Sequence, residues 1–226
     1  IQEARLLDLM LILHAEHGGG NNSAFVCRTL SSTGTDTYSA IAGAVSSLKG
    51  PLHGGANKKV MEMFRDIKSS VGTASEDKLS RYLDKILDKE ANDRTGIIYG
   101  LGHAVYTASD PRAEIIKKYA VEMAAGTDKM EDFELMQRIE KLGIEKLTAR
   151  KNLQIPICAN VDMYSGLVYE MLGIPEDLFT PLFAIARIAG WCAHRIEEVI
   201  SGKKLIRPAY RAAIRHSAYT PMSERE

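Results

Sequence analysis

Residues 181–200 read Pro-Leu-Phe-Ala-Ile-Ala-Arg-Ile-Ala-Gly-Trp-Cys-Ala-His-Arg-Ile-Glu-Glu-Val-Ile. Apolar side chains return there at intervals of three and four residues, which is the period of one face of an α-helix. A glycine, Gly202, follows the run as a stop signal. The stretch therefore predicts a long helix, and it sets one arginine, Arg187, among apolar neighbours.

The same helical period continues through most of the chain before this stretch. Asp110 followed by Pro111, for example, joins a capping residue to the residue favoured at the first helical position. Runs of β-branched residues are scarce, and only Ile97–Tyr99 suggests a short strand. We therefore expect an all-α fold, with helices over residues 1–15, 36–48, 57–69, 76–89, 110–125, 127–142, 161–172 and 181–200.

The first of these segments, residues 1–15, is the interior of a helix by its sequence. It contains neither glycine nor proline, no capping residue precedes it, and only Asp8 is polar between Leu6 and Leu13. We expect this helix to be buried on nearly all sides. We also expect the chain to be a fragment of a longer protein, in which case the Leu6–Leu13 surface is partly uncovered here.

The overall composition is that of a globular protein. Of 226 residues, 45% are hydrophobic and 26% are charged, which excludes wholesale disorder. Lys plus Arg and Asp plus Glu number 29 each, so the net charge is +0. Such a balance argues against a partner of the nucleic-acid or acidic-membrane class.

The sequence also predicts a cytoplasmic setting. The longest apolar run, Leu9–Leu13, is far below the roughly 20 residues that a membrane span needs, and no export signal precedes it. The three cysteines are widely spaced and form no Cys-x-x-Cys pair, so neither a disulfide framework nor a zinc knuckle is expected.

Four of the six histidines lie in glycine-rich loops or at helix ends: His14, His17, His53 and His103. Glycine beside a polar residue lets a ligand approach the backbone closely. One histidine in a loop is usually an ordinary surface residue, but three separate His-Gly loops favour a shared binding site.

Several familiar motifs are absent or incomplete. Residues 17–20 resemble the oxyanion loop of lipases, yet no Gly-x-Ser-x-Gly elbow accompanies them. Residues 100–102 lack the third glycine of a dinucleotide fingerprint. His14 and His17 around Glu16 do not have the zincin spacing, so no metal site is predicted, although a histidine-ligated metal hydrolase stays as an alternative.

One acid and three arginines complete the candidates. Asp162 begins an apolar helix, where it is either an N-terminal cap or a buried functional acid. Arg187 needs an anionic partner because its surroundings are apolar, and that partner is either a protein carboxylate or a substrate carboxylate. Arg112 and Arg207 stand in similarly apolar or proline-marked settings.

Taken in order, these segments resemble the citrate synthase family. The matching segments are His14-Ala-Glu-His17, Ser31-Ser-Thr-Gly34, Gly50-Pro-Leu-His53-Gly-Gly-Ala-Asn57, Gly100-Leu-Gly-His103-Ala-Val-Tyr, Asp110-Pro-Arg112-Ala, Asn160-Val-Asp162-Met-Tyr-Ser-Gly166, Ala186-Arg187 and Arg207-Pro208. They span nearly the whole chain, and together they are highly specific. Leu101 departs from the family, where an aromatic or small residue is more usual, and we expect it to alter packing only.

The resemblance implies an architecture. Family members are longer and begin with helices that this chain lacks, so the chain resembles their C-terminal part. Residues 1–54 and 166–226 would belong to a large helical domain, and residues 55–165 to an inserted small domain that closes over the substrate.

The resemblance also implies an acyltransferase that condenses acetyl-CoA with oxaloacetate and hydrolyses the product to citrate and CoA. Asp162 would take the proton from the thioester methyl group. His53 would donate a hydrogen bond to the thioester oxygen, and His103 would polarise the ketone of oxaloacetate.

The remaining implied roles concern binding. Arg112 and Arg187 would hold the substrate carboxylates, with help from His17, and no metal or redox cofactor is needed. Arg207 would reach into the neighbouring subunit of a homodimer. The loop residues that would hold CoA are Ile97, Gly100, Leu101 and Gly102.

Two further alternatives stay open at this level. A 2-methylcitrate synthase shares the same motifs and uses propionyl-CoA, which differs by one methylene, worth about 1–3 kcal/mol in an apolar site. A non-catalytic helical fragment that keeps the fold is the other.

Overall fold

The computed structural model describes residues 2–73, 75–103, 105–152, 156–202, 204–209, 211 and 218–225. Within these ranges the protein is all-α, as the sequence predicts. The helices are α1 (Gln2–His14), α2 (Asn22–Ser31), α3 (Thr37–Leu48), α4 (Ala56–Val71), α5 (Glu76–Leu87), α6 (Pro111–Ala124), α7 (Lys129–Lys151), α8 (Asp162–Met171) and α9 (Phe179–Ser201), with short 3-10 turns at Glu176–Leu178 and Met222–Glu224.

The expected strand at Ile97–Tyr99 is wrong. The nearest β-type contact in the described part of the chain is an isolated antiparallel bridge between Leu101 and Ala159. Gly96 and Gly100 flank the three residues with φ values of 80° and 85°, which turn the backbone away from an extended path. The segment is therefore a loop.

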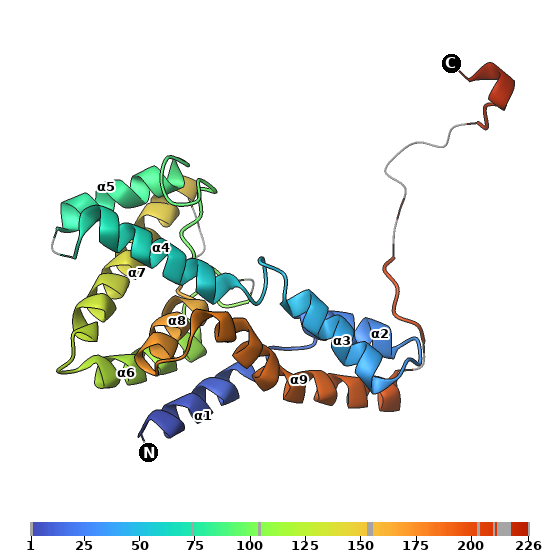
Figure 1. Ribbon diagram of the computed structural model, residues 1–226. Coiled ribbons are helices and arrows are strands. Elements are labelled where there is room, and N and C mark those ends of the chain that lie inside the picture. Colours follow the sequence, from blue (N-terminus) through green and yellow to red (C-terminus); the bar gives the residue numbers. More distant parts are fainter. Residues whose placement is uncertain are drawn as a thin grey trace.

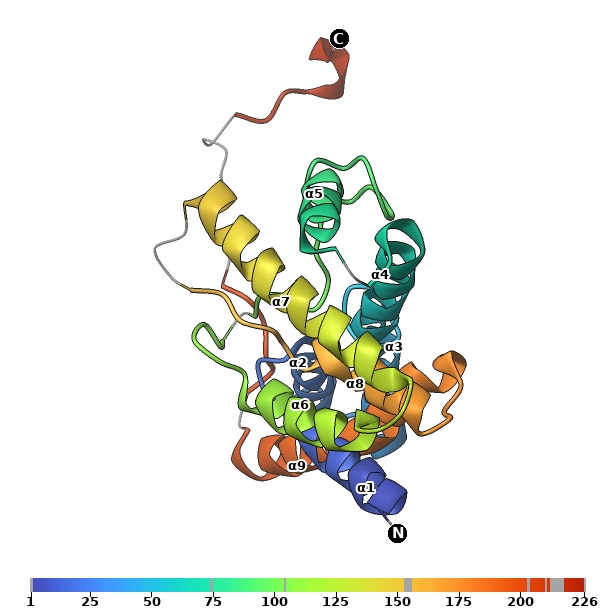
Figure 2. The same cartoon turned by 90° about the vertical axis from the view of Figure 1, so that its left-hand side faces the viewer.

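The helices gather into two packed groups along α9 (Figure 1). Helices α4–α8 lie at one end with α1 beside them, and α2 and α3 lie at the other end against the second half of α9 (Figures 1 and 2). The larger core contains α4–α8 together with Leu6 and Met10 of α1 and Phe179 of α9. The smaller core is built around Trp191 by α2, α3 and α9.

Local signals in the sequence define several helix boundaries. The Asp36 carboxylate accepts the Ser39 amide at the start of α3, at 3.0 Å. Asp110 does the same for the Arg112 amide at the start of α6, also at 3.0 Å, so its predicted capping role is confirmed. Each satisfies an amide that has no partner within its own helix.

Two helices differ from expectation because tertiary contacts stabilise them. The sequence predicts no helix over 22–31, a segment rich in Ser, Asn and Thr, yet α2 forms where it packs against α3 and α9. Helix α7 continues to Lys151, nine residues beyond the predicted end. Its extension is held by Lys146 and Arg150, whose ammonium and guanidinium groups lie 2.7 and 2.9 Å from the Asp84 carboxylate of α5.

Helix α1 is buried on one face only. Leu6 and Met10 are buried, whereas Ile12 is 62% exposed. The expectation of burial on nearly all sides is therefore wrong for this structure, and the expected partial uncovering of Leu6–Leu13 is confirmed.

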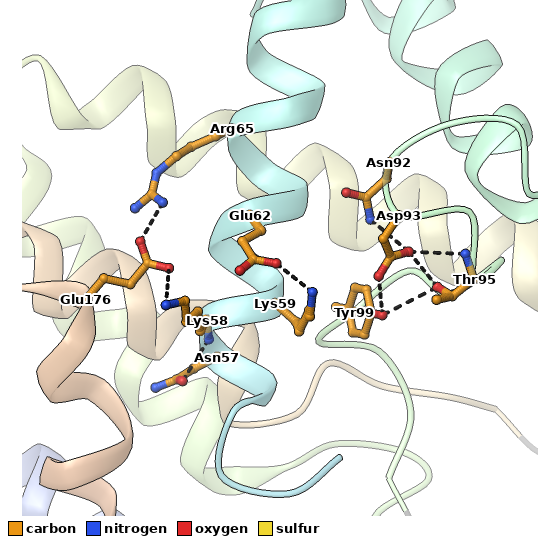
Figure 3. Close-up of polar contacts among 10 residues, drawn as sticks. All are labelled: Asn57, Lys58, Lys59, Glu62, Arg65, Asn92, Asp93, Thr95, Tyr99 and Glu176. Atoms are coloured by element: carbon orange, nitrogen blue, oxygen red, sulfur yellow. Dashed lines mark hydrogen bonds and ion pairs between the residues drawn. The ribbon is translucent and has the colours of Figure 1, made fainter. Parts of the chain in front are cut away.

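Ion pairs connect α4 to the turn that precedes α9 (Figure 3). Arg65 of α4 lies 2.6 Å from one oxygen of Glu176, and Lys58 lies 3.9 Å from the other.

None of the described helices is both long and apolar enough to cross a membrane.

Candidate active site

His17 and His103 meet at the centre of the site. Their Nε2 atoms are 2.8 Å apart. The other ring nitrogen of His103, Nδ1, accepts the amides of Val105 and Tyr106 at 2.9 and 3.0 Å. Burial and the nearby Arg112 lower the pKa of His103, so the ring is neutral and its proton is on Nε2. His103 Nε2 is therefore a hydrogen-bond donor, and its acceptor in this structure is His17 Nε2.

Arg112 brings a second donor to the same place. Its Nη2 atom lies 3.4 Å from His103 Nε2 and 2.7 Å from Asp110 Oδ2. Burial alone would raise the pKa of Asp110, but its hydrogen bonds to Arg112 outweigh burial and hold the pKa below its usual value. Asp110 thus orients the guanidinium while one edge faces His103.

Arg187 is buried in α9 without a carboxylate partner. It is 1% exposed, its Nε donates to the His14 carbonyl at 2.6 Å, and its Nη1 donates to Asn21 Oδ1 at 3.2 Å. Among the residues that the structure describes, no acid lies within ion-pair distance. Burial, then the charge of Arg112, lower its pKa to about 10. Of the two anionic partners predicted for Arg187, a protein carboxylate is therefore not found among the residues that the structure describes.

His53 is connected to Arg187 through two polar residues. Its Nε2 lies 3.0 Å from Ser23 Oγ, and Ser23 donates to Asn21 Oδ1 at 3.1 Å. Trp191 Nε1 also donates to Ser23, at 3.1 Å. Burial and the charge of Arg187 lower the pKa of His53, which keeps the ring neutral. Its Nδ1 has no hydrogen-bond partner within the described ranges.

Ser23 and Asn21 belong to the site, although none of the sequence motifs indicates them. Ser23 is fully buried in the first turn of α2, a helix that the sequence pattern does not reveal. The available signal is the run of polar residues directly after the glycines at 18–20.

Asp162 is not a capping residue. It is the first residue of α8, but Val161 is in the capping position and no side-chain cap is formed. The Asp162 amide donates to Asn160 Oδ1 at 3.0 Å, while its carboxylate makes no hydrogen bond to any described residue. Burial raises its pKa to about 6, against the opposing charges of Arg112 and Arg187. The result is an unpaired carboxylate that can accept a proton near neutral pH.

The loop at 97–102 is tied to the segment that precedes Asp162. The Asn160 amide donates to the Gly100 carbonyl, and the Gly102 amide donates to the Cys158 carbonyl, both at 2.8 Å. A Cβ at Gly100 would lie 2.7 Å from Met163 Sδ, so the close approach requires glycine. Leu101 packs toward Gly143 of α7, in agreement with a packing role.

Asp93 braces the start of this loop (Figure 3). Its carboxylate accepts the hydroxyls of Tyr99 and Thr95 at 2.6 and 2.7 Å. Ile97, one of the predicted CoA-binding residues, is 47% exposed. The loop is therefore held at both ends, and binding of CoA there stays a prediction.

Arg207 lies apart from the other predicted residues. It is exposed, in a segment anchored by the Ile206 amide, which donates to Ser32 Oγ at 3.0 Å. It contacts no other predicted site residue in the described part of the chain. Nor do three or more His, Cys, Asp or Glu side chains of that part gather in a group able to hold a metal ion.

The family model described as "Citrate synthase, C-terminal domain" matches residues 2–209. A citrate synthase of Synechocystis sp. is 44% identical over 223 residues, which are 98% of this chain and 52% of that protein. A 2-methylcitrate synthase of Corynebacterium glutamicum is 39% identical over 227 residues, 99% of this chain and 51% of that protein. The chain spans about half the length of the curated relatives it matches.

A solved structure has the same architecture. It is the citrate synthase of the thermophilic archaeon Thermoplasma acidophilum in a ternary complex with carboxymethyl coenzyme A and oxaloacetate. The TM-score is 0.78 at 31% identity, over 99% of this chain and 56% of that one. The matched sequence motifs, the all-α fold and these comparisons together show that the chain belongs to the citrate synthase family.

Proposed function

We propose that the protein containing this chain condenses acetyl-CoA with oxaloacetate and hydrolyses the product to citrate and CoA. The single observation that carries the proposal is the unpaired Asp162 carboxylate, whose pKa burial raises to about 6 and which is close enough to Arg112 and Arg187 to feel their charges. Three histidines with lowered pKa values, His17, His53 and His103, surround the same two arginines. A base, neutral donors and anion-binding groups are what this condensation requires.

Asp162 takes a proton from the thioester methyl group. A thioester methyl is a very weak acid, so removal of its proton needs a base and stabilisation of the charge that develops on the thioester oxygen. His53 supplies the hydrogen bond to that oxygen. In this role the single ring proton is on Nδ1, so Nε2 accepts from the Ser23 hydroxyl, which turns its proton from Asn21 to His53 when the substrate binds. The free Nδ1 and the neutral state of the ring support the proposal, since a neutral donor is better matched to an enolate.

His103 polarises the oxaloacetate ketone. The Nε2 proton that Val105 and Tyr106 impose on this ring supports the role. The enolate carbon then bonds to the ketone carbon, and the ketone oxygen takes a proton and becomes a hydroxyl. Water finally cleaves the thioester and releases CoA as its thiol.

Arg112 and Arg187 bind the two carboxylates of oxaloacetate, and His17 orients them. Arg187 supports this most strongly, because a buried guanidinium without an acidic partner is costly unless an anion joins it. The loop containing Ile97, Gly100, Leu101 and Gly102 holds CoA through its backbone groups.

The test is thiol release from acetyl-CoA, measured with and without oxaloacetate. Release that requires oxaloacetate is expected. Release at the same rate without oxaloacetate would show a simple thioesterase and contradict the condensation.

The second candidate is a 2-methylcitrate synthase, favoured by the 39% identity to the Corynebacterium glutamicum enzyme of that name. The two reactions differ by one methylene, so the preference is a ratio of about 10–200-fold at most from one apolar contact. The ratio of kcat/KM for acetyl-CoA and propionyl-CoA decides between them. Equal loss of both activities in Asp162→Asn would also exclude the non-catalytic alternative.

The proposal includes a homodimer and a mobile small domain. Arg207 completes the site of the partner subunit, which is supported by its exposure and by its separation from its own site in the described residues. Residues 55–165 form the part that closes over the substrate. The position of α4–α7 at the end of the molecule away from α2 and α3 supports this division.

A further inference from the structure

Helix α9 contacts three consecutive residues that lead to His17, and the contacts keep register. Arg187 Nε donates to the His14 carbonyl at 2.6 Å. The Gly190 amide donates to the Ala15 carbonyl at 3.2 Å. A step of three residues along α9, from Arg187 to Gly190, therefore corresponds to a step of one residue at the end of α1, from His14 to Ala15.

His194 provides the third contact. It follows Gly190 by four residues, so it lies on the same face of α9. Its Nε2 lies 2.8 Å from Glu16 Oε2, and the two atoms meet without in-line hydrogen-bond geometry. The contact is ionic when His194 is protonated. On its other side, Nδ1 lies 3.6 Å from the carboxylate of Glu197, which is largely exposed.

The Glu16 side chain contacts both His194 and the backbone of His17. Its second carboxylate oxygen, Oε1, accepts the amides of His17 and Gly18 at 2.6 and 2.5 Å. Burial would raise the pKa of Glu16, but the His194 contact and the two amides together lower it. One side chain therefore joins α9 to the two amides that set the direction of the His17 residue.

Gly190 makes the close approach possible. A Cβ at this position would lie 2.3 Å from the Ala15 carbonyl oxygen and 3.1 Å from Glu16 Oε2. Such distances are far below contact between non-bonded atoms, and the obstacle is backbone. Only glycine lets α9 approach the segment in this register.

We infer that Glu16, Gly190 and His194 are positioning residues that hold the His17 ring against His103. The inference rests on the proposed function for its consequence: a displaced His17 orients oxaloacetate poorly. Its structural content, the placement of His17, is independent of which anion the site binds.

The first measurement follows the His17 ring directly, without any substrate. Burial, then Arg112 and His103, lower the pKa of His17 to about 4. In the NMR titration of the histidine rings, assigned with His17→Ala, we expect the His17 signal of Glu16→Ala to titrate closer to the ordinary value of about 6.5. An unchanged His17 titration in a folded Glu16→Ala protein would overturn the inference.

The second measurement separates binding of the two substrates. In Glu16→Ala we expect KM for oxaloacetate to rise about fivefold or more, because charge-assisted hydrogen bonds to two amides are lost. KM for acetyl-CoA should change less than about twofold. Equal changes in both KM values would show a general structural defect and overturn the inference.

Conservative variants and a matched control sharpen the test. Glu16→Gln keeps an oxygen for the two amides, so we expect it to recover most of the loss seen in Glu16→Ala. His194→Gln, which keeps an N–H group, should be milder than His194→Ala. Glu197→Gln removes the other carboxylate beside the same histidine and should leave both KM values unchanged. A loss in Glu197→Gln equal to that in Glu16→Ala would contradict the role of Glu16.

A wild-type protein that binds no oxaloacetate but shows the shifted His17 titration would refute the proposed function and leave the positioning inference supported. The two conclusions are thereby tested separately.

Discussion

Asp162 is a carboxylate whose surroundings oppose its charge, and this has opposite consequences for stability and activity. Its pKa of about 6 lies above the ordinary value of 3.8, so the folded protein holds the proton more tightly than the unfolded chain does. Stability therefore falls as pH rises from about 3.8 to 6 and stays lower above that range. We predict that Asp162→Asn raises the free energy of unfolding at pH 7.5 by about 1–3 kcal/mol while activity falls at least about 100-fold.

Chemical denaturation and thiol release, both at pH 7.5, measure the two effects. Glu197→Gln is the control, since it removes an exposed acid far from this carboxylate in the sequence. A variant that lost both stability and activity would indicate a structural carboxylate.

The same group predicts a pH dependence of catalysis. A base must be ionised to accept a proton, so kcat/KM should rise with pH up to about 6 and level off above it. Burial also lowers the pKa values of His53 and His103, which favours the neutral forms of both rings over this pH range. The profile is obtained by measuring thiol release at low substrate concentration between pH 5 and 8, in steps of about half a pH unit. A flat profile would contradict the assignment of Asp162 as the base.

At the scale of elements, the contact between α9 and the end of α1 depends on Gly190. Alanine is the better helix former by about 1 kcal/mol, so propensity alone favours Gly190→Ala. The new Cβ would meet the Ala15 carbonyl oxygen at 2.3 Å, however, and backbone cannot move aside cheaply. We predict a net loss of about 1–3 kcal/mol of stability, the usual cost of overpacking.

Gly43→Ala in α3 is the matched control for this prediction. Its Cβ would lie 2.2 Å from Leu30 Cδ1, the far end of a flexible side chain that can rotate away. Thermal unfolding should show a smaller loss in Gly43→Ala than in Gly190→Ala. Equal losses in the two variants would mean that the approach of α9 to Ala15 is not the constraint.

For the whole molecule, the proposed homodimer makes a prediction about mixed subunits. If Arg207 acts in the partner's site, Arg207→Ala and Asp162→Asn damage the two sites of a dimer differently. A mixed dimer has one site with both changes and one site with neither. Random mixing of the two inactive variants should therefore restore about a quarter of the wild-type activity, because about half of the dimers are mixed and each has one intact site.

The measurement is thiol release before and after the two variants are unfolded and refolded together. Each variant refolded alone is the control. No recovery in the mixture would mean that Arg207 acts within its own chain or not at all.

Local sequence determined most of the secondary structure. Helical period and capping residues act over a few positions, so Asp110 with Pro111 predicted α6, and the apolar run at 181–200 predicted α9. The same kind of signal indicated the histidine loops and Arg187, because glycine beside a polar residue and a charge among apolar residues are visible without a fold.

Tertiary structure alone decided how these pieces form a site. Helix α2 exists because α3 and α9 pack against it, and only then does Ser23 reach His53. The Asp162 carboxylate lacks a capping role and has a raised pKa because distant elements bury it. The contact between His194 of α9 and Glu16 joins residues far apart in the chain. Contacts of this kind depend on packing between elements, and no local pattern of residues encodes them.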